Sequence, residues 1–211
     1  MRSVKKTLFS VVIGTVLAAS ASAECGTIPK TGPFLSYAIE PMTDAGTVWL
    51  EVTLRFRLDG RTADITLPSE WQGQRELYRA VRSLAVMSPG ASLQQGEKPW
   101  KKTLTFPAGR VVTLRYQVIK DWTGNINASS YFRVMLGADY FQVMGRNFLV
   151  YPSLPEDTEL PIFLEWKNIP SDWGVISSLS AGAVSRGVPK GSGADELVSR
   201  GAFWCLYRFR W

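Results

Sequence analysis

The 211 residues contain no histidine. The candidates for a functional site are therefore carboxylates, tryptophans and two cysteines. Nucleophilic sites of the Ser-His-Asp and Cys-His kinds need an imidazole as general base, and the common catalytic zinc sites use histidine ligands. Neither a glycine-rich phosphate loop nor a calcium-loop pattern is present. We therefore expect no catalytic residue, no metal ligand and no cofactor in this chain, and so no enzyme.

Glycoside hydrolysis by a pair of carboxylates is the one catalytic chemistry that stays open. The candidate carboxylates are Asp121, Asp139, Glu156, Asp157 and Glu159. The last three crowd together in the sequence, which is typical of a solvated acidic turn between strands. We favour that interpretation over a catalytic one.

The tryptophans offer a second kind of site. Trp71, Trp100 and Trp122 lie near predicted turns, where indole rings could form a platform that stacks on sugars. Tryptophan in a β domain also serves as core or inter-domain packing, and that is the more frequent use. A stand-alone module that binds carbohydrate or cell-envelope material is therefore the alternative function.

Cys25 and Cys205 stand far apart in the sequence, and in an oxidising compartment they could form a disulfide. Closing so long a loop would stabilise the fold by about 5 kcal/mol in the chain-entropy model. Two unpaired thiols are the other interpretation, and both stay open.

Residues 1–23 have the pattern of a bacterial signal peptide. Basic residues precede an apolar run over Leu8–Ala19, which is too short to anchor the chain in a membrane, and Ala21-Ser22-Ala23 forms a cleavage site. We expect a periplasmic or secreted protein without a membrane anchor. Cleavage removes three of the 24 basic residues and none of the 18 acidic ones, and the small remaining excess does not favour nucleic acid as a partner.

Hydrophobic residues alternate with polar ones along most of the remaining chain, which predicts an all-β fold, an antiparallel β-sandwich. Val48–Phe56 and Ala63–Leu67 flank Asp59-Gly60, a turn signal that predicts a hairpin. A second hairpin is predicted over Lys102–Lys120, around Pro107-Ala108-Gly109.

Shorter strands and one helical turn complete the prediction. Gln74–Met87 is expected to form a short helical turn followed by a strand. Further strands are predicted over Tyr140–Val143, Asn147–Tyr151, Leu160–Trp166 and Gly174–Leu179. The predicted organisation is a signal peptide (1–23), an extended N-terminal segment (24–46), the β-sandwich (47–184), and a linker with an aromatic tail (185–211).

The stretch ELPIFLEWKNIPSDWGVISSL, residues 159–179, resembles part of the N-terminal domain of the glycyl aminopeptidase family, which are thermolysin-related zinc metallopeptidases. The signature residues are Trp166, Pro170, Trp173 and Gly174. Tyr140-Phe141, the segment Phe148 to Pro152 and the strand Val48–Phe56 are also similar to that family, and the likeness extends roughly over Phe34–Phe203.

This resemblance implies a β-sandwich placed ahead of a helical catalytic domain, against which it packs and whose cleft it helps to wall. In that family the zinc ligands and the general-base glutamate lie in the catalytic domain. The resemblance therefore carries no catalytic residue over to this chain. It implies an exported, non-catalytic domain that packs against a catalytic partner or stands in for one.

In the stretch ELVSRGAFWCLYRFRW, residues 196–211, Glu196 to Arg200 followed by Gly201-Ala202-Phe203 resembles the junction between the sandwich and the catalytic part, and the aromatic tail lies beyond it. Tyr207, Phe209 and Trp211 alternate with arginines, which predicts a strand with one apolar face. We expect this aromatic tail to lack a neighbouring strand. It would then bind a catalytic domain or another protein, for instance by strand addition, or cause self-association.

Overall fold

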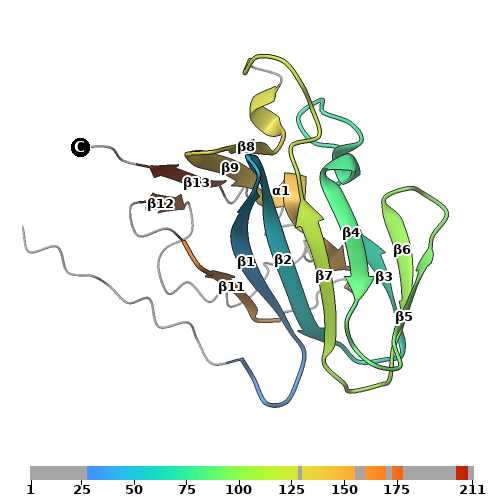
Figure 1. Cartoon of the computed structure of the whole chain (residues 1–211). Coiled ribbons are helices and arrows are strands. Elements are labelled where there is room, and N and C mark those ends of the chain that lie inside the picture. Colours follow the sequence, from blue (N-terminus) through green and yellow to red (C-terminus); the bar gives the residue numbers. More distant parts are fainter. Residues whose placement is uncertain (1–27, 128–129, 155–159, 170–172, 178–202, 209–211) are drawn as a thin grey trace, which may run out of the picture.

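The computed structural model describes residues 28–127, 130–154, 160–169, 173–177 and 203–208. These residues are mostly in β-strands, which form three sheets (Figure 1). The first sheet has the order β11 (Ile162–Trp166), β1 (Phe34–Asp44), β2 (Thr47–Arg57), β7 (Val112–Val118) and β4 (Val81–Val86). The second has the order β10 (Tyr151–Pro152), β3 (Thr62–Thr66), β6 (Lys101–Thr105) and β5 (Ser92–Gln95). The third has the order β12 (Trp173–Ser177), β13 (Phe203–Arg208), β9 (Tyr140–Met144) and β8 (Met135–Gly137).

The first two sheets enclose a common hydrophobic core, as the alternation of the sequence predicts. Leu50, Val52, Leu54 and Phe56 of β2 are all 0% exposed, whereas the residues between them keep access to solvent. Side chains of β3, β6 and β7 belong to the same buried cluster. Neighbouring strands are antiparallel apart from β1 and β11, which are parallel. The predicted antiparallel β architecture is thus confirmed in outline, and the third sheet adds to it.

Both predicted hairpins are wrong in their pairing. The chain crosses from the first sheet to the second between β2 and β3, and from the second sheet to the first between β6 and β7. The partners of β2 are β1 and β7, and those of β6 are β3 and β5. The physical reason is that alternation identifies the buried face of a strand but not the strand beside it. When the buried faces of two sheets meet, a turn between consecutive strands can connect the sheets as readily as it closes a hairpin.

The hairpin that the structure does form here joins β1 to β2. Ala45 and Gly46 have φ angles of 46° and 82°, the left-handed values that a tight two-residue hairpin turn requires. β1 lies in the segment that the sequence analysis places before the sandwich. Because Phe34, Leu35 and Ile39 are fully buried, the first sheet begins at Phe34 and not at Thr47.

One expected strand is replaced by a helical turn. Over the range predicted as Asn147–Tyr151, the chain forms α1 (Gly145–Phe148) and then the short β10. The Asn147 side chain accepts a hydrogen bond from the Met144 amide at 2.9 Å, and this local contact competes with strand pairing. The helical turn and strand predicted over Gln74–Met87 are present as η1 (Leu77–Ala80) and β4, and β9, β11 and β12 lie at predicted strands.

The aromatic tail has neighbours on both sides where the structure describes it. β13 pairs with β12 on one edge and with β9 on the other. The expectation of a strand without a neighbour is therefore corrected for Phe203–Arg208. Outside the described residues lie the predicted signal peptide, residues 185–202 of the predicted linker and tail, and residues 209–211.

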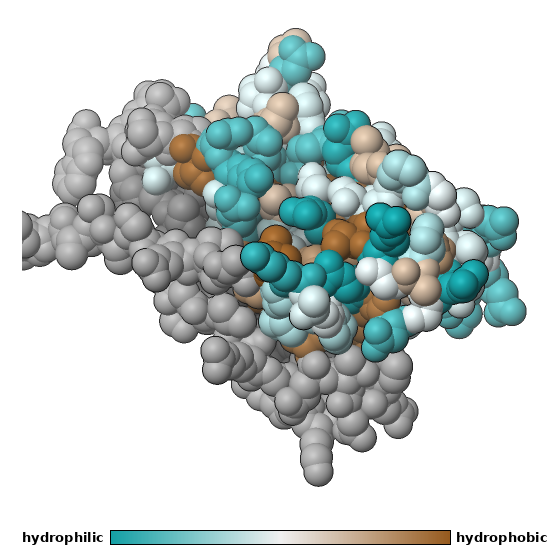
Figure 2. All heavy atoms as spheres, turned by 90° about the horizontal axis from the view of Figure 1, so that it is seen from below, coloured by the Kyte–Doolittle hydropathy of each residue, from teal (hydrophilic) through white to brown (hydrophobic). Residues whose placement is uncertain are grey.

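Figure 2 views the molecule from below, relative to Figure 1. Hydrophilic residues cover much of the described surface on this side, and hydrophobic residues form smaller patches between them. Among the described residues, no helix has the length and apolar character needed to cross a membrane.

Candidate functional site: an aromatic platform held by Arg133

Two loops meet at the upper end of the molecule in Figure 1, close to the green helical turn η1 and the yellow helical turn η2 (Ser130–Phe132). The first loop contains a tight turn closed by two backbone hydrogen bonds between Trp71 and Gln74, at 2.9 and 2.8 Å. Gln72 and Gly73 have φ angles of 48° and 74°, as such a turn requires. The backbone that carries Trp71 is therefore fixed by local geometry.

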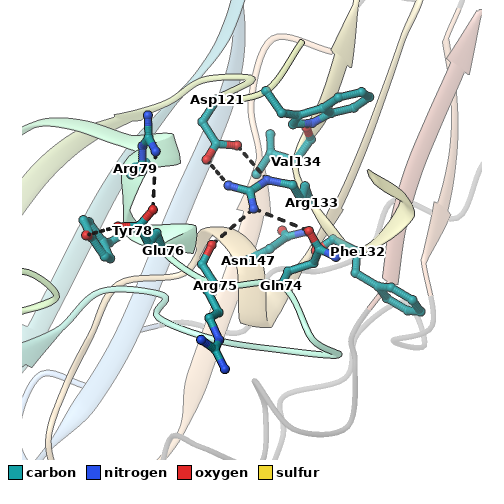
Figure 3. Close-up of polar contacts among 11 residues, drawn as sticks. Gln74, Arg75, Glu76, Tyr78, Arg79, Asp121, Phe132, Arg133, Val134 and Asn147 are labelled. Carbon is teal, nitrogen blue, oxygen red and sulfur yellow. Dashed lines mark hydrogen bonds and ion pairs between the residues drawn. The ribbon is translucent and has the colours of Figure 1, made fainter. Parts of the chain in front are cut away.

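The second loop contains η2 and the two residues that follow it, and side chains hold its backbone from two directions (Figure 3). The side-chain amide of Asn147 donates a hydrogen bond to the Phe132 carbonyl at 3.3 Å. The Trp122 indole N–H donates to the Val134 carbonyl at 2.7 Å. Since Asn147 is fully buried and also bonds to Met144, the second loop is tied to α1.

Arg133 connects the two loops. Its guanidinium forms an ion pair with Asp121, whose side chain is only 2% exposed, while the Arg133 side chain is 16% exposed. The same guanidinium donates to the Arg75 carbonyl at 3.2 Å and to the Gln74 side-chain oxygen at 3.5 Å (Figure 3). One nearly buried cation thus satisfies groups from both loops. Charge-assisted hydrogen bonds of this kind are stronger than neutral ones.

The two loops together present a row of three aromatic rings, which we call the aromatic platform: Trp71, Phe132 and Tyr131. The Trp71 and Phe132 rings lie edge to face, with centroids 5.4 Å apart at 82°, and Phe132 and Tyr131 do the same at 5.5 Å and 89°. Tyr131 is 42% exposed, although large aromatic side chains are usually better buried. The platform is a surface feature, and no cavity is needed to reach it.

Ile126 is next to the turn that precedes the platform and is 57% exposed. The turn itself is closed by Asn127 and Ser130, whose side chains each accept a hydrogen bond from the other residue's amide, at 3.0 and 2.8 Å. The Tyr131 amide also donates to the Asn127 carbonyl at 3.2 Å. An exposed isoleucine therefore precedes the contacts through which Asn127 holds the backbone of Ser130 and Tyr131.

Charged residues of both signs surround the first loop. Arg75 and Glu70 are 3.9 Å apart, with side chains 81% and 63% exposed, and Arg79 and Glu76 are 3.4 Å apart. Tyr78 donates to the Glu76 carboxylate at 3.2 Å. Partial desolvation, and then this hydrogen bond, raise the pKa of Tyr78. The aromatic platform thus has exposed positive and negative charges close by.

Of the three tryptophans selected from the sequence, only Trp71 belongs to the platform. The Trp122 indole uses its N–H on Val134, and the Lys120 ammonium lies 4.1 Å from the centroid of its ring. The Trp100 ring packs against Tyr78, with centroids 6.1 Å apart, and has the Lys98 ammonium at 5.4 Å. Both rings therefore have protein groups of their own chain against them.

The residues that carry the family resemblance form a packing cluster. The Trp166 and Trp173 rings lie 4.9 and 5.9 Å from the Phe141 ring, which is fully buried. This cluster joins β11 of the first sheet to β9 and β12 of the third. Gly174 lies in β12, and Pro170 is outside the described residues.

The structure places the remaining candidates only in part. Cys205 lies in β13 opposite Gln142 and Ile176, while Cys25 is outside the described residues, so the disulfide and the two unpaired thiols both stay open. The carboxylates Glu156, Asp157 and Glu159 are also outside them. Asp121 serves the ion pair with Arg133. Within the part of the chain that the structure describes, no group of three or more His, Cys, Asp or Glu residues is placed to hold a metal ion.

Sequence reasoning missed Tyr131, Phe132 and Arg133. Their signal is the run SYFRV, residues 130–134, in which two aromatic residues and an arginine follow a turn. Tyrosine, tryptophan and arginine are the residue types enriched where proteins bind partners. That composition, within one loop, could have directed attention to the second loop.

Comparison with known proteins gives a likeness of fold only. No protein-family model matches the sequence, and no curated protein matches it significantly. The crystal structure of an aminopeptidase N family protein from Idiomarina loihiensis is similar, with a TM-score of 0.59 and 17% identity over 82% of this chain and 29% of that chain. Native leukotriene A4 hydrolase from Saccharomyces cerevisiae gives a TM-score of 0.34 and 8% identity over 83% of this chain and 26% of that one. The chain thus spans less than a third of the Idiomarina loihiensis protein and shares its fold over that part.

Proposed function

We propose that this chain is an exported, non-catalytic β-sandwich domain of aminopeptidase-type proteins, which packs against a catalytic partner domain or stands in for one. The observation that carries the proposal is the fold likeness to a part, 29%, of an aminopeptidase N family protein. The resemblance of residues 159–179 to the N-terminal domain of glycyl aminopeptidases supports it independently, because it concerns the sequence and not the backbone.

The residues at hand suit a scaffold better than a hydrolytic centre. The 211 residues contain no histidine for a zinc ligand or a general base, and the buried carboxylate of Asp121 is neutralised by Arg133. The signature tryptophans pack on Phe141, where they join two sheets. These features are those of a domain that supports a site built elsewhere.

A hydrolysis assay tests the catalytic part of the proposal. The mature chain, beginning at Glu24, is incubated with zinc and a panel of aminoacyl p-nitroanilides, beside an active zinc aminopeptidase as positive control. We expect no release of nitroaniline above the blank. Turnover that a chelator abolishes and added zinc restores would refute the non-catalytic assignment.

Fractionation tests export separately. The full sequence is expressed in a Gram-negative host, and the protein is recovered from the periplasm and the cytoplasm. We expect periplasmic protein whose N-terminal residue is Glu24. An uncleaved chain that stays in the cytoplasm would contradict export without affecting the assignment as a domain.

Carbohydrate binding is the second candidate, favoured by the 42% exposure of Tyr131 on the aromatic platform. Titration with cell-wall polysaccharides, followed by tryptophan fluorescence, examines it. Saturable quenching that Trp71→Ala removes and Trp100→Phe retains would support this candidate. The absence of quenching across the panel would reject it.

A further inference from the structure

We propose that the outer face of the first sheet binds the surface of a bilayer that contains anionic phospholipids. The contact is made by four arginines that form a diagonal line over β2, β7 and β4, which lie side by side in Figure 1. We call Arg57, Arg55, Arg115 and Arg82 the arginine row. The inference does not depend on the proposed function.

The two arginines of β2 point away from the core. Leu54 and Phe56 are 0% exposed and belong to the buried cluster, and successive side chains of a strand point to opposite faces. Arg55 is exposed, while Arg57 is half-buried and its guanidinium donates to the Lys30 carbonyl at 3.0 Å. β2 thus contributes two arginines to the outer face, at a spacing of about 7 Å.

The next two strands continue the line. In β7, Arg115 lies diagonally across from Arg55, because the register places Arg55 opposite Thr113, two residues from Arg115. In β4, Arg82 lies diagonally across from Arg115, because its partner in β7 is Gln117. Diagonal neighbours in an antiparallel sheet are about 7–8 Å apart. Four guanidinium groups are therefore spread evenly over three strands.

Positive charge is in excess along the row. Arg115 forms an ion pair with Glu51 at 3.2 Å, and its side chain is still 55% exposed. Among the described residues, no carboxylate forms an ion pair with Arg55, Arg57 or Arg82. An exposed ion pair such as Arg115–Glu51 contributes little to stability, so Arg115 is also available to an anionic partner.

The other carboxylates on this face belong to the strands beyond the row. Glu40 and Asp44 are in β1, and Glu165 is in β11, where it pairs with Lys167 at 3.6 Å. The strand order β11-β1-β2-β7-β4 keeps these groups at one side of the sheet and the arginine row at the other. The outer face is therefore divided by charge, and an anionic partner is attracted to the half formed by β2, β7 and β4.

The residue types favour phosphate groups in a plane. A guanidinium donates two parallel hydrogen bonds to a phosphate, and it gives up hydration more easily than an ammonium group does. Lipid headgroups move laterally, so each arginine of a fixed row can find its own phosphate. Met87, which is 48% exposed, lies beside the row, because its amide donates to the carbonyl of Thr113 at 2.9 Å. Its apolar side chain can enter the headgroup region.

The edge of the sheet disfavours an extended acidic peptide as the partner. Such a peptide typically binds a sheet by adding a strand to its edge, and β4 is the edge strand next to the row. The pairing of β4 with β7 shifts register between Arg82 and Ala85, and Ser83 has a φ angle of 54°. A bulge of this kind bends the edge and interrupts the ladder that an added strand would need.

Co-sedimentation of the mature chain with vesicles tests the proposal. One set of vesicles contains phosphatidylcholine alone, and the other contains equal parts of phosphatidylcholine and phosphatidylglycerol. We expect binding to the second set only. Added salt should release the protein, because it screens interactions between exposed charges.

Substitutions in the row test which charges carry the binding. Arg55→Gln and Arg82→Gln should each weaken the partition coefficient about fivefold, and the double variant about 25-fold, as expected for one basic residue each near an anionic membrane. Arg55→Lys should retain most of the binding, because the charge is kept. Lys98→Gln is the matched control, since it removes one exposed positive charge from the loop between β5 and β6 of the second sheet. Thermal unfolding of each variant checks that the fold is preserved.

Three results would overturn the proposal. The first is a chain that stays in the supernatant with the anionic vesicles at low salt. The second is vesicle binding that the double variant leaves unchanged or that Lys98→Gln weakens equally. The third is binding of soluble polyglutamate through Arg55 and Arg82 without binding to vesicles, which would assign the row to an acidic polypeptide.

Discussion

Tyr37 and Tyr116 bind the two polar backbone groups of a single residue, Val150. The Tyr37 hydroxyl donates to the Val150 carbonyl at 2.9 Å, and the Val150 amide donates to the Tyr116 hydroxyl at 3.2 Å. Tyr37 comes from β1 and Tyr116 from β7, with β2 between those strands, and both side chains are buried. The segment between α1 and β10 is thereby fastened to the first sheet from two sides.

Removing either hydroxyl should destabilise the fold. Tyr116→Phe leaves the buried Val150 amide without a partner, and Tyr37→Phe leaves its carbonyl unpaired. We expect a loss of about 1–3 kcal/mol of unfolding free energy for each variant, measured by urea denaturation. Tyr78→Phe, which removes only an exposed hydrogen bond to Glu76, should change the free energy by no more than about 0.5 kcal/mol. Equal effects at the three positions would contradict this account.

Alkaline pH should destabilise the protein through the same pair. Burial, followed by the proximity of Tyr116 and Tyr151, raises the pKa of Tyr37 well above its usual value, and burial raises the pKa of Tyr116. Above about pH 10 the unfolded chain releases these protons while the folded chain keeps them, so stability is complete below that pH and falls above it.

The expected slope is about 1.4 kcal/mol per pH unit for each tyrosine. This slope develops through about pH 10, where tyrosine in the unfolded chain titrates, and is complete only about one pH unit above it. Unfolding free energies from urea denaturation between about pH 9 and pH 12 would follow it. Tyr37→Phe should make the decline shallower by one tyrosine's share. A wild-type and a variant profile that run parallel would be inconsistent with the raised pKa of Tyr37.

Among the polar contacts that hold the platform, the ion pair of Asp121 with Arg133 should contribute most to the free energy of unfolding. Asp121→Ala leaves a guanidinium that is 16% exposed without its carboxylate, and we expect a loss of about 3–5 kcal/mol in unfolding free energy. Asp121→Ala combined with Arg133→Met should recover part of this loss, because the unpaired charge is gone. Arg115→Ala, in an ion pair whose arginine is 55% exposed, is the control and should cost less than about 1 kcal/mol.

Phe141 should be essential to the joint between the first and third sheets. Phe141→Ala removes a fully buried ring from contact with Trp166 and Trp173, at an expected cost of about 3–5 kcal/mol. Tryptophan emission should shift to longer wavelength, because water reaches the two indoles. Phe141→Leu should show a smaller loss, under about 1.5 kcal/mol, since most of the volume is kept. An unchanged emission spectrum in Phe141→Ala would argue against this packing.

The sequence predicts which faces of the strands are buried far better than which strands are neighbours. Leu50 to Phe56 alternate with polar residues, and this local pattern leads directly to the buried face of β2. The crossing from β2 to β3 was mistaken for a hairpin, because pairing depends on residues distant in sequence. At Asn147 the prediction of a strand fails for a local reason. The Met144 amide donates a hydrogen bond to the Asn147 side chain, and this contact favours a helical turn.

The candidate site was found in part. Trp71 was selected because tryptophan stood near a turn, and it does belong to the platform. Arg133 and its neighbours were missed because the contact of Arg133 with the Arg75 carbonyl spans 58 residues, and no local pattern records it. Trp100 and Trp122 were selected on the same ground as Trp71, yet lysines of the same chain lie against their rings.

The parallel pairing of β1 with β11 limits how early in folding the first sheet can form all its strand pairs. Leu35 lies opposite Ile162, and in the third sheet Phe203 lies opposite Met144. The earliest strand must therefore wait for one of the later ones, and β9 must wait for β13. Contacts so distant along the chain slow folding, because a long loop has to close before they form. We expect β1 and β9 to keep an open edge during synthesis until β11 and β13 have been made, and to be accessible to chaperones in that interval.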